Sequence, residues 1–199
     1  MRLLQILHLL EKHGEADKDL PVSSSMIEHV TGWPRDTIRK DISCLSKIEG
    51  KALGKNVGYE PELLIELIKT ALGLDRPRKF CVVGLGRLGS AYLNFTPREL
   101  AEFELAAGFD TNVNRVEILQ SPAPLFPAHK MAEIIRRFGI EIALLCVPAS
   151  EAQAAAEKCV EAGIRGILNF APAVLSLPVE IIVNNVYVTD ALRSLAIQI

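Results

Sequence analysis

The chain has 199 residues, enough for two small domains; hydrophobic residues make up 49% of it and the formal net charge is −2. No apolar stretch approaches the roughly 18–20 residues that cross a bilayer. Polar residues interrupt the apolar run at the N-terminus, so it lacks the continuous core of a signal peptide. The four cysteines form no CxxC pair, so neither a zinc site nor a disulfide framework is indicated. We therefore expect a soluble, cytoplasmic protein without a metal.

Residues 1–74 predict a small helical domain, because apolar residues recur there at helical spacing. A first helix is expected to end at Gly14, and a second to run from serine N-caps near 23–25 to Gly32. A third opens at Pro34 and a fourth at Pro61. Glycines at 50, 54 and 58 between these last two helices are typical of a wing hairpin. The pattern indicates a winged helix-turn-helix.

The third helix and the segment after it are locally basic. Between Arg35 and Lys55 there are six basic residues and three acidic ones, an excess of +3 that suits a phosphate backbone. A solvated helix face would give the same count, but the helix-turn-helix context favours DNA. The predicted DNA-binding residues are Ser24, Arg35, Thr37, Arg39, Lys40, Lys51 and Lys55. For Cys44, on the same helix, we expect burial in preference to a role as a thiol sensor.

After residue 78 the pattern changes to alternating strands and helices, which predicts a doubly wound α/β fold with a parallel sheet. The first strand, 80–83, is wholly apolar, as expected for a strand covered on both faces. The further expected strands are 103–109, 142–147, 167–170 and 181–183. The expected helices are 87–100, 128–138, 150–162 and a final one near 189–197. We predict a Rossmann domain over 75–186 and a separate C-terminal helix in 187–199.

A GxGxxG motif formed by Gly84, Gly86 and Gly89 follows the first strand and opens a helix. The first glycine permits a tight turn, the second lets a pyrophosphate approach the backbone, and the third packs the helix on the strand. Asp110, 21 residues after Gly89, ends the second strand, where an acid can hold ribose hydroxyls and repel a 2′-phosphate. This favours NAD(H) over NADP(H). The alternative is that Asp110 only caps a loop.

A dehydrogenase needs a proton donor or acceptor near the nicotinamide, and the sequence does not offer an obvious one. Three of the four histidines lie in the helical N-terminal part, and His129 is expected to begin a surface helix. The sequence therefore predicts a nucleotide receptor that is not an enzyme. Two alternatives remain open, a minimal NAD-dependent oxidoreductase and a module for another adenine nucleotide such as coenzyme A.

Short motifs along essentially the whole chain carry a family resemblance. They are VSS at 22–24, IRKDIS at 38–43, VGY at 57–59, CVPA at 146–149, AGI at 162–164 and GILNFAP at 166–172. With the glycine loop they resemble the bacterial redox-sensing repressors called Rex. The resemblance implies a homodimer that swaps C-terminal helices over 187–199. It also implies binding to a near-palindromic operator that is lost when NADH binds.

The glycine motif and the resemblance together assign the cofactor contacts. The expected NAD(H)-binding residues are Gly84, Leu85, Gly86, Arg87, Leu88, Gly89, Asp110, Val147, Pro148, Asn169, Phe170, Ala171 and Pro172. Phe170 and Pro172 are expected to line the nicotinamide, although a simple turn at the end of a strand would also account for them.

The chain departs from the family in the wing and in the residues of the switch. Lys55, Asn56 and Val57 replace a Lys-Arg-Gly motif, after an apparent insertion. The resemblance places an aspartate, an arginine and a tyrosine of the family's switch at Tyr187, His8 and Phe95 of this chain. Because these replacements remove the charged pair, we expect NADH to weaken DNA binding only about 10-fold, unless Tyr187 and His8 form a substitute hydrogen-bonded switch.

Overall fold

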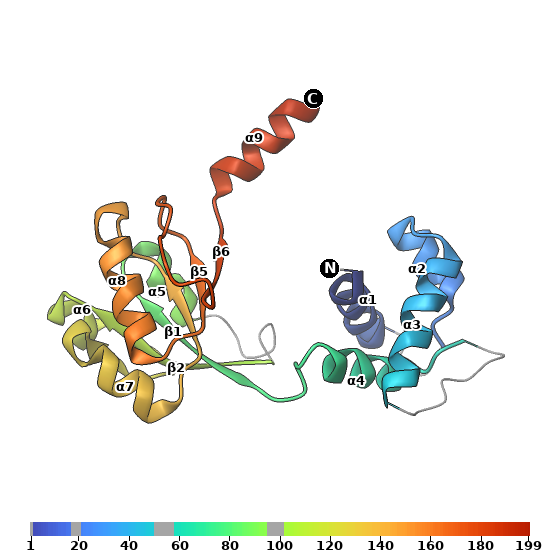
Figure 1. The fold of residues 1–199 in the computed structure, drawn as a ribbon, viewed down its shortest axis with the longest axis horizontal. Coiled ribbons are helices and arrows are strands. Elements are labelled where there is room, and N and C mark those ends of the chain that lie inside the picture. The colour runs from blue at the N-terminus through green and yellow to red at the C-terminus, as the bar shows by residue number, and fades with distance from the viewer. Residues whose placement is uncertain (1, 17–20, 50–57, 95–101) are drawn as a thin grey trace. The chain divides into compact units, whose positions relative to one another are not determined.

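The structure is a computed structural model that describes residues 2–16, 21–49, 58–94 and 102–199. The chain divides into two compact units, Met1–Arg76 and Pro77–Ile199 (Figure 1). None of the helices in these described ranges is long and apolar enough to cross a membrane.

The first unit is helical. Its elements are α1 (Arg2–Ala16), α2 (Ser24–Thr31), α3 (Arg35–Glu49) and α4 (Pro61–Ala71). The Ser23 hydroxyl caps α2 by accepting the Met26 N–H at 3.2 Å, and Gly32 ends that helix with a φ of 72°. Gly14 does not end α1, contrary to prediction, because one glycine lowers helix propensity by only about 1 kcal/mol and the helix continues to Ala16.

One apolar cluster holds the four helices together. It includes Ile6 and Leu10 of α1, Ile27 of α2, Ile38, Ile42 and Leu45 of α3, and Leu64 and Ile68 of α4. The predicted wing falls mostly on residues 50–57, outside the described residues. Val22, just before α2, and Tyr59, just after residues 50–57, form an antiparallel bridge with N–O distances of 2.8 Å.

Cys44 is exposed, which corrects the expectation of burial. The buried side of α3 is set by Ile38, Ile42 and Leu45 at helical spacing. A residue two positions after Ile42 is rotated by about 200° from it, so Cys44 lies on the solvent side.

The second unit contains a six-stranded parallel sheet in the order β3-β2-β1-β4-β5-β6. The strands are β1 (Arg78–Val83), β2 (Phe103–Asp110), β3 (Leu125–Pro127), β4 (Ile142–Leu145), β5 (Gly166–Asn169) and β6 (Ile182–Asn185). The order reverses between β1 and β4, as in a Rossmann fold. The predicted doubly wound parallel sheet is confirmed.

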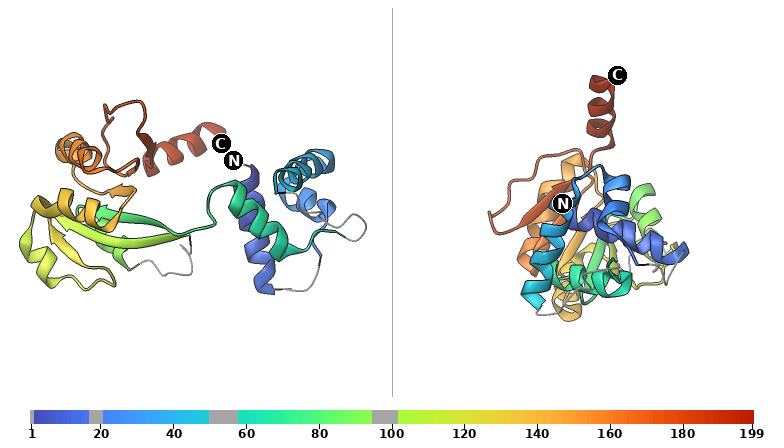
Figure 2. Two further views of the ribbon diagram at one scale, coloured as in Figure 1. Left: turned by 60° about the horizontal axis from the view of Figure 1, so that its bottom comes forward. Right: turned by 90° about the vertical axis from the view of Figure 1, so that its right-hand side faces the viewer.

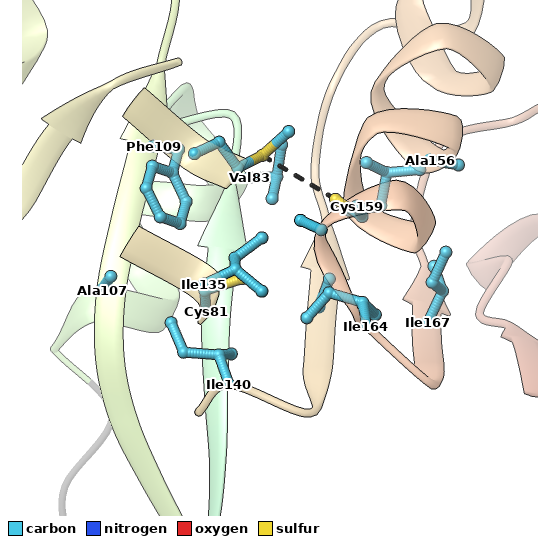
Figure 3. Close-up of a cluster of buried hydrophobic side chains, with 14 of the residues drawn as sticks. Cys81, Val83, Ala107, Phe109, Ile135, Ile140, Ala156, Cys159, Ile164 and Ile167 are labelled. Atoms are coloured by element: carbon cyan, nitrogen blue, oxygen red, sulfur yellow. Dashed lines mark hydrogen bonds between the residues drawn. The ribbon is translucent and has the colours of Figure 1, made fainter. Parts of the chain in front are cut away.

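Helices cover both faces of this sheet. They are α5 (Arg87–Leu93), α6 (Val113–Ile118), α7 (Met131–Phe138), preceded by the short 3₁₀ helix η1 (Ala128–Lys130), and α8 (Ala149–Ala162). The last helix, α9 (Val188–Gln198), has no buried residue and does not cover the sheet. On one face, α7 and α8 bury Ile135 and Cys159 against Cys81 and Val83 of β1 (Figure 3). The Cys159 thiol also contacts the Met131 sulfur at 3.8 Å. On the other face, Leu93 of α5 packs against alternate residues of the same strand.

Two elements were not predicted, and one strand is shorter than expected. Strand β3 has three residues and ends at a proline, so it lacks the alternation that marks a strand. Helix α6 is six residues long and begins at an Asn112 cap, which accepts the Asn114 N–H at 3.0 Å. Strand β4 ends at Leu145 instead of 147, because the chain leaves the sheet before Pro148 and begins α8.

The C-terminal helix α9 projects from the end of β6, away from the sheet (Figures 1 and 2). None of its side chains is buried, and Val188, Leu192 and Leu195 are all exposed. The last strand before it is also largely exposed, with Ile182 open to solvent. This end of the unit therefore presents an extended apolar surface.

Candidate nucleotide site and DNA-binding surface

In the glycine loop between β1 and α5, each of the three glycines meets a different structural requirement. Gly84 has a φ of 91°, and a Cβ on it would lie 2.7 Å from the Cys146 carbonyl oxygen. A Cβ on Gly89 would lie 1.8 Å from the Gly84 carbonyl oxygen, so only glycine lets α5 begin so close to the loop. A Cβ on Gly86 would meet nothing within 4 Å. The middle glycine therefore faces open space, where a phosphate group could approach the backbone.

Asp110 lies at the end of β2 and is 5% exposed. Its carboxylate accepts the Leu85 N–H and the Asn112 N–H, each at 2.7 Å. The Arg115 guanidinium, half exposed on α6, adds a contact at 3.3 Å. Asp110 therefore holds the glycine loop in place, which agrees in part with the alternative that it only caps a loop. One oxygen, Oδ1, accepts the Asn112 N–H and retains capacity for a ribose hydroxyl.

The loops after β4 and β5 come to the same edge of the sheet. Gly84 lies against Val147, whose Cγ1 would be 2.8 Å from a Cβ on the glycine. The ring of Phe170, after β5, packs on Tyr92 of α5 with a centroid distance of 5.0 Å. Burial raises the pKa of the Cys146 thiol to about 12, so this cysteine, which lines the site, is protonated near neutral pH.

The predicted cofactor residues divide into two groups by exposure. The side chains of Leu85, Asn169 and Ala171 are buried, so we expect them to support the site from behind. The others lie at the surface of this edge, at least in part, and could touch a ligand. They are Gly84, Gly86, Arg87, Leu88, Val147, Pro148, Phe170 and Pro172. Gly89 and Asp110 are the exceptions, because both are buried.

The structure describes two of the three predicted switch residues, and these two belong to different units. His8 is exposed on α1 of the first unit, and Tyr187 is the N-cap residue of α9 in the second. Phe95 lies outside the described residues. The structure therefore does not test a His8–Tyr187 pair, and Tyr187 has other partners within its own unit.

The helix-turn-helix surface is formed by α2 and α3. Arg39 and Lys40 are exposed on α3, and Thr37 is partly exposed. Ser24 is nearly buried, and its hydroxyl accepts the Arg39 Nε–H at 3.2 Å, so it orients that arginine. The predicted wing residues, Lys51 and Lys55, lie outside the described residues.

Glu28 of α2 forms an ion pair with Arg35. The hydrogen bond that the Arg35 side chain donates within this pair lowers the pKa of the Glu28 carboxyl. The pair offsets part of the positive charge predicted for α3. The excess charge on this surface therefore centres on Arg39 and Lys40.

Sequence reasoning missed several residues of these two sites. Tyr92 and Arg115 join the nucleotide site, and Glu28 modifies the DNA-binding surface. Tyr92 could have been found, since it falls one helical turn after Gly89 and so returns to the side of the loop. The other two depend on contacts between elements that spacing alone does not give.

The fold and the two sites define a Rossmann nucleotide-binding protein with a helix-turn-helix unit at its N-terminal end. A family model described as a CoA binding domain matches residues 75–173. A redox-sensing transcriptional repressor Rex from Limosilactobacillus fermentum is 33% identical over 194 residues, covering 98% of this chain and 85% of that protein. The chain therefore belongs to the Rex family of redox-sensing transcriptional repressors.

Solved structures of RSP, a Rex-family repressor, agree with this assignment. RSP in complex with β-NAD+ and operator DNA is 29% identical, with a TM-score of 0.85 and coverage of 99% of this chain and 88% of that one. RSP in complex with β-NADH has the same identity and a TM-score of 0.81, covering 99% of this chain and 90% of that one.

Proposed function

We propose that this protein represses transcription by binding operator DNA through its first unit, and that NADH binding to its second unit releases the DNA. The observation that carries the proposal is the glycine loop, in which Gly84 and Gly89 can only be glycine while Gly86 faces open space. That combination leaves room for a pyrophosphate beside the first backbone N–H groups of α5. The RSP complexes with NADH, and with NAD+ and operator DNA, support it.

The protein is expected to bind its nucleotide without transforming it. Cys146, the thiol at the site, is protonated near neutral pH, and curated relatives that this chain matches over nearly its whole length are repressors. The conclusion rests on family membership together with the lack of an evident proton-transfer group in the sequence.

A homodimer that swaps C-terminal helices would cover the apolar surface at the end of the second unit. Val188, Leu192 and Leu195 lie at positions i, i+4 and i+7 of α9, on one side of the helix. All three are exposed within the single chain. A second copy of this chain, contributing the same helix, would remove them from water.

The function is tested by measuring operator affinity with and without NADH. The probe is a duplex that the ligand-free protein selects from a randomised DNA pool. We expect saturating NADH to weaken binding about 10-fold, equivalent to about 1.4 kcal/mol of coupling. Binding that NADH leaves unchanged would contradict the proposed function. A thousandfold or larger loss of operator affinity would instead show that NADH and DNA binding are coupled as strongly as by the exchange of a charged partner.

Coenzyme A is the second candidate ligand, because the matching family model is described as a CoA binding domain. Calorimetric titration with NADH, NAD+, NADPH and CoA separates the candidates. Tighter binding of CoA than of NADH would replace the nucleotide assigned here.

Asp110→Ala is expected to narrow the difference in affinity between NADH and NADPH. The carboxylate repels a 2′-phosphate and accepts ribose hydroxyls, so its loss should weaken NADH more than NADPH. Both affinities should fall somewhat, since the Leu85 N–H also loses its acceptor. The ratio of the two dissociation constants is therefore the quantity to measure. An unchanged ratio would leave Asp110 with the loop-fixing role alone.

A further inference from the structure

We propose that a hydrogen-bonded junction of Asn169, Asn185 and Tyr187 transmits the state of the nucleotide site to helix α9, with the Tyr187 hydroxyl as its positioning group. The inference rests on the proposed function and deepens it, because it names how nucleotide binding would reach the C-terminal helix. The junction lies between the loop after β5 and the first residue of α9.

Asn169 is the centre of the junction and is fully buried. Its side-chain oxygen, Oδ1, accepts the Ala171 N–H at 3.0 Å. Its amide nitrogen lies 2.9 Å from both the Ala173 carbonyl oxygen and the Asn185 Oδ1, and 3.2 Å from the Tyr187 hydroxyl. A buried carboxamide with partners on both of its polar atoms is held in one orientation, because turning it would leave donors and acceptors unpaired.

The Tyr187 hydroxyl closes the junction from the side of α9. It donates to the Ala173 carbonyl at 2.8 Å and lies 3.2 Å from the Asn185 Oδ1. Since no side chain of α9 is buried within the chain, the helix has no packing of its own to set its direction. Within a single chain, the N-cap residue and its hydroxyl therefore fix how the helix leaves the sheet, before the swapped partner covers its apolar side.

The other end of the junction is the nucleotide site. Phe170 follows Asn169 directly, and its ring rests on Tyr92 of the helix that the glycine loop begins. The Phe170 N–H donates to the Leu145 carbonyl at 3.0 Å, and the Asn169 carbonyl accepts the Val186 N–H at 2.9 Å. Both bonds hold the peptide group that joins Asn169 to Phe170, and a ligand that displaces the Phe170 ring would therefore move the chain that follows it. The Ala173 carbonyl, shared by Asn169 and Tyr187, would move with it.

This arrangement is a substitute for a charged exchange, built from neutral groups. A neutral hydrogen bond contributes less than a buried charged pair, so the junction suits a coupling of about 10-fold and not a much larger one. The junction can form without His8, because every partner of Tyr187 named above lies in the second unit.

Tyr187→Phe tests the junction, because it removes the hydroxyl and keeps the ring. We expect NADH affinity and ligand-free operator affinity to stay within about threefold of the unaltered protein. The factor by which NADH weakens operator binding should fall from about 10 to below about 3. Asn184→Ala on β6, next to Asn185, is the control, since Asn184 makes no side-chain hydrogen bond with the described residues. The control should keep the full factor, and a full factor in Tyr187→Phe would overturn the inference.

Hydrogen exchange at the start of α9 separates this inference from the proposed function. NADH should alter the exchange of amides 186–190 in the unaltered protein and leave it unchanged in Tyr187→Phe. If NADH binds but does not affect operator affinity, the proposed function fails. The comparison of amide hydrogen exchange in the two proteins still tests the junction in that case. Equal responses of the two proteins would overturn the junction, and absence of NADH binding would overturn both.

Discussion

Gly86→Val is expected to lose NADH affinity by about 100-fold or more while the protein stays folded. The loss of NADH affinity follows from the position of the glycine, because the isopropyl side chain of valine would occupy the space that a pyrophosphate needs. A hundredfold loss corresponds to about 2.7 kcal/mol of binding free energy. Folding should be preserved, since a Cβ at this position meets no protein atom within 4 Å. The backbone there has a φ of −67° and a ψ of −164°, which valine adopts without strain.

Calorimetric titration with NADH measures the effect, and thermal unfolding checks that the fold is intact. Gly86→Ala serves as the graded control, because its single methyl group should weaken NADH less than valine does. Gly89→Val is expected to fail differently, by unfolding, since a Cβ there would lie 1.8 Å from the Gly84 carbonyl oxygen. If Gly86→Val bound NADH within about threefold of the unaltered protein, the pyrophosphate would have to lie elsewhere.

The glycine loop could be predicted from the sequence because its chemistry is local. A tight turn, an open middle position and a close helix start all depend on residues within six positions of one another. The structure supplies the reason for each glycine, with Gly84 at positive φ and Gly89 against the turn. Asp110 was placed correctly at the end of β2 for the same reason.

The partners of Asp110 could not be predicted in the same way. Arg115 reaches the carboxylate from α6, a six-residue helix too short to show a hydrophobic repeat. The Leu85 N–H reaches it only because β1 and β2 are paired in the observed register. Pairing register is a property of the assembled sheet and is not encoded in the spacing along one strand.

The junction at Tyr187 shows the same limit more clearly. Asn169 and Asn185 meet because β5 and β6 align these two residues, 16 positions apart in the chain. The family resemblance drew attention to Tyr187 for a different reason, the loss of a charged residue. In the structure, the Tyr187 hydroxyl forms hydrogen bonds with neutral groups, and neither the spacing nor the resemblance predicted these partners.

The DNA-binding surface is expected to depend most strongly on Arg39 and Lys40. Both are exposed on α3, whereas Arg35 on the same helix is paired with Glu28. The near-buried Ser24 hydroxyl holds the Arg39 side chain at its Nε, which lowers the entropy lost when the guanidinium engages a base or a phosphate. A base-reading arginine contributes about 1–3 kcal/mol, and a lysine on phosphate adds a salt-dependent share.

The double variant Arg39→Ala/Lys40→Ala should therefore bind the selected operator about 100-fold more weakly, with a shallower dependence on salt. Arg136→Ala/Arg137→Ala on α7 is the matched control, because it removes the same charge from an exposed basic pair in the other unit. The control should lose little affinity, which separates a specific surface from the effect of net charge. Fluorescence anisotropy over a range of salt concentrations measures both quantities. If the two double variants bound the operator equally well, α3 would not be the helix that contacts DNA, and the surface would have to be sought elsewhere on the first unit.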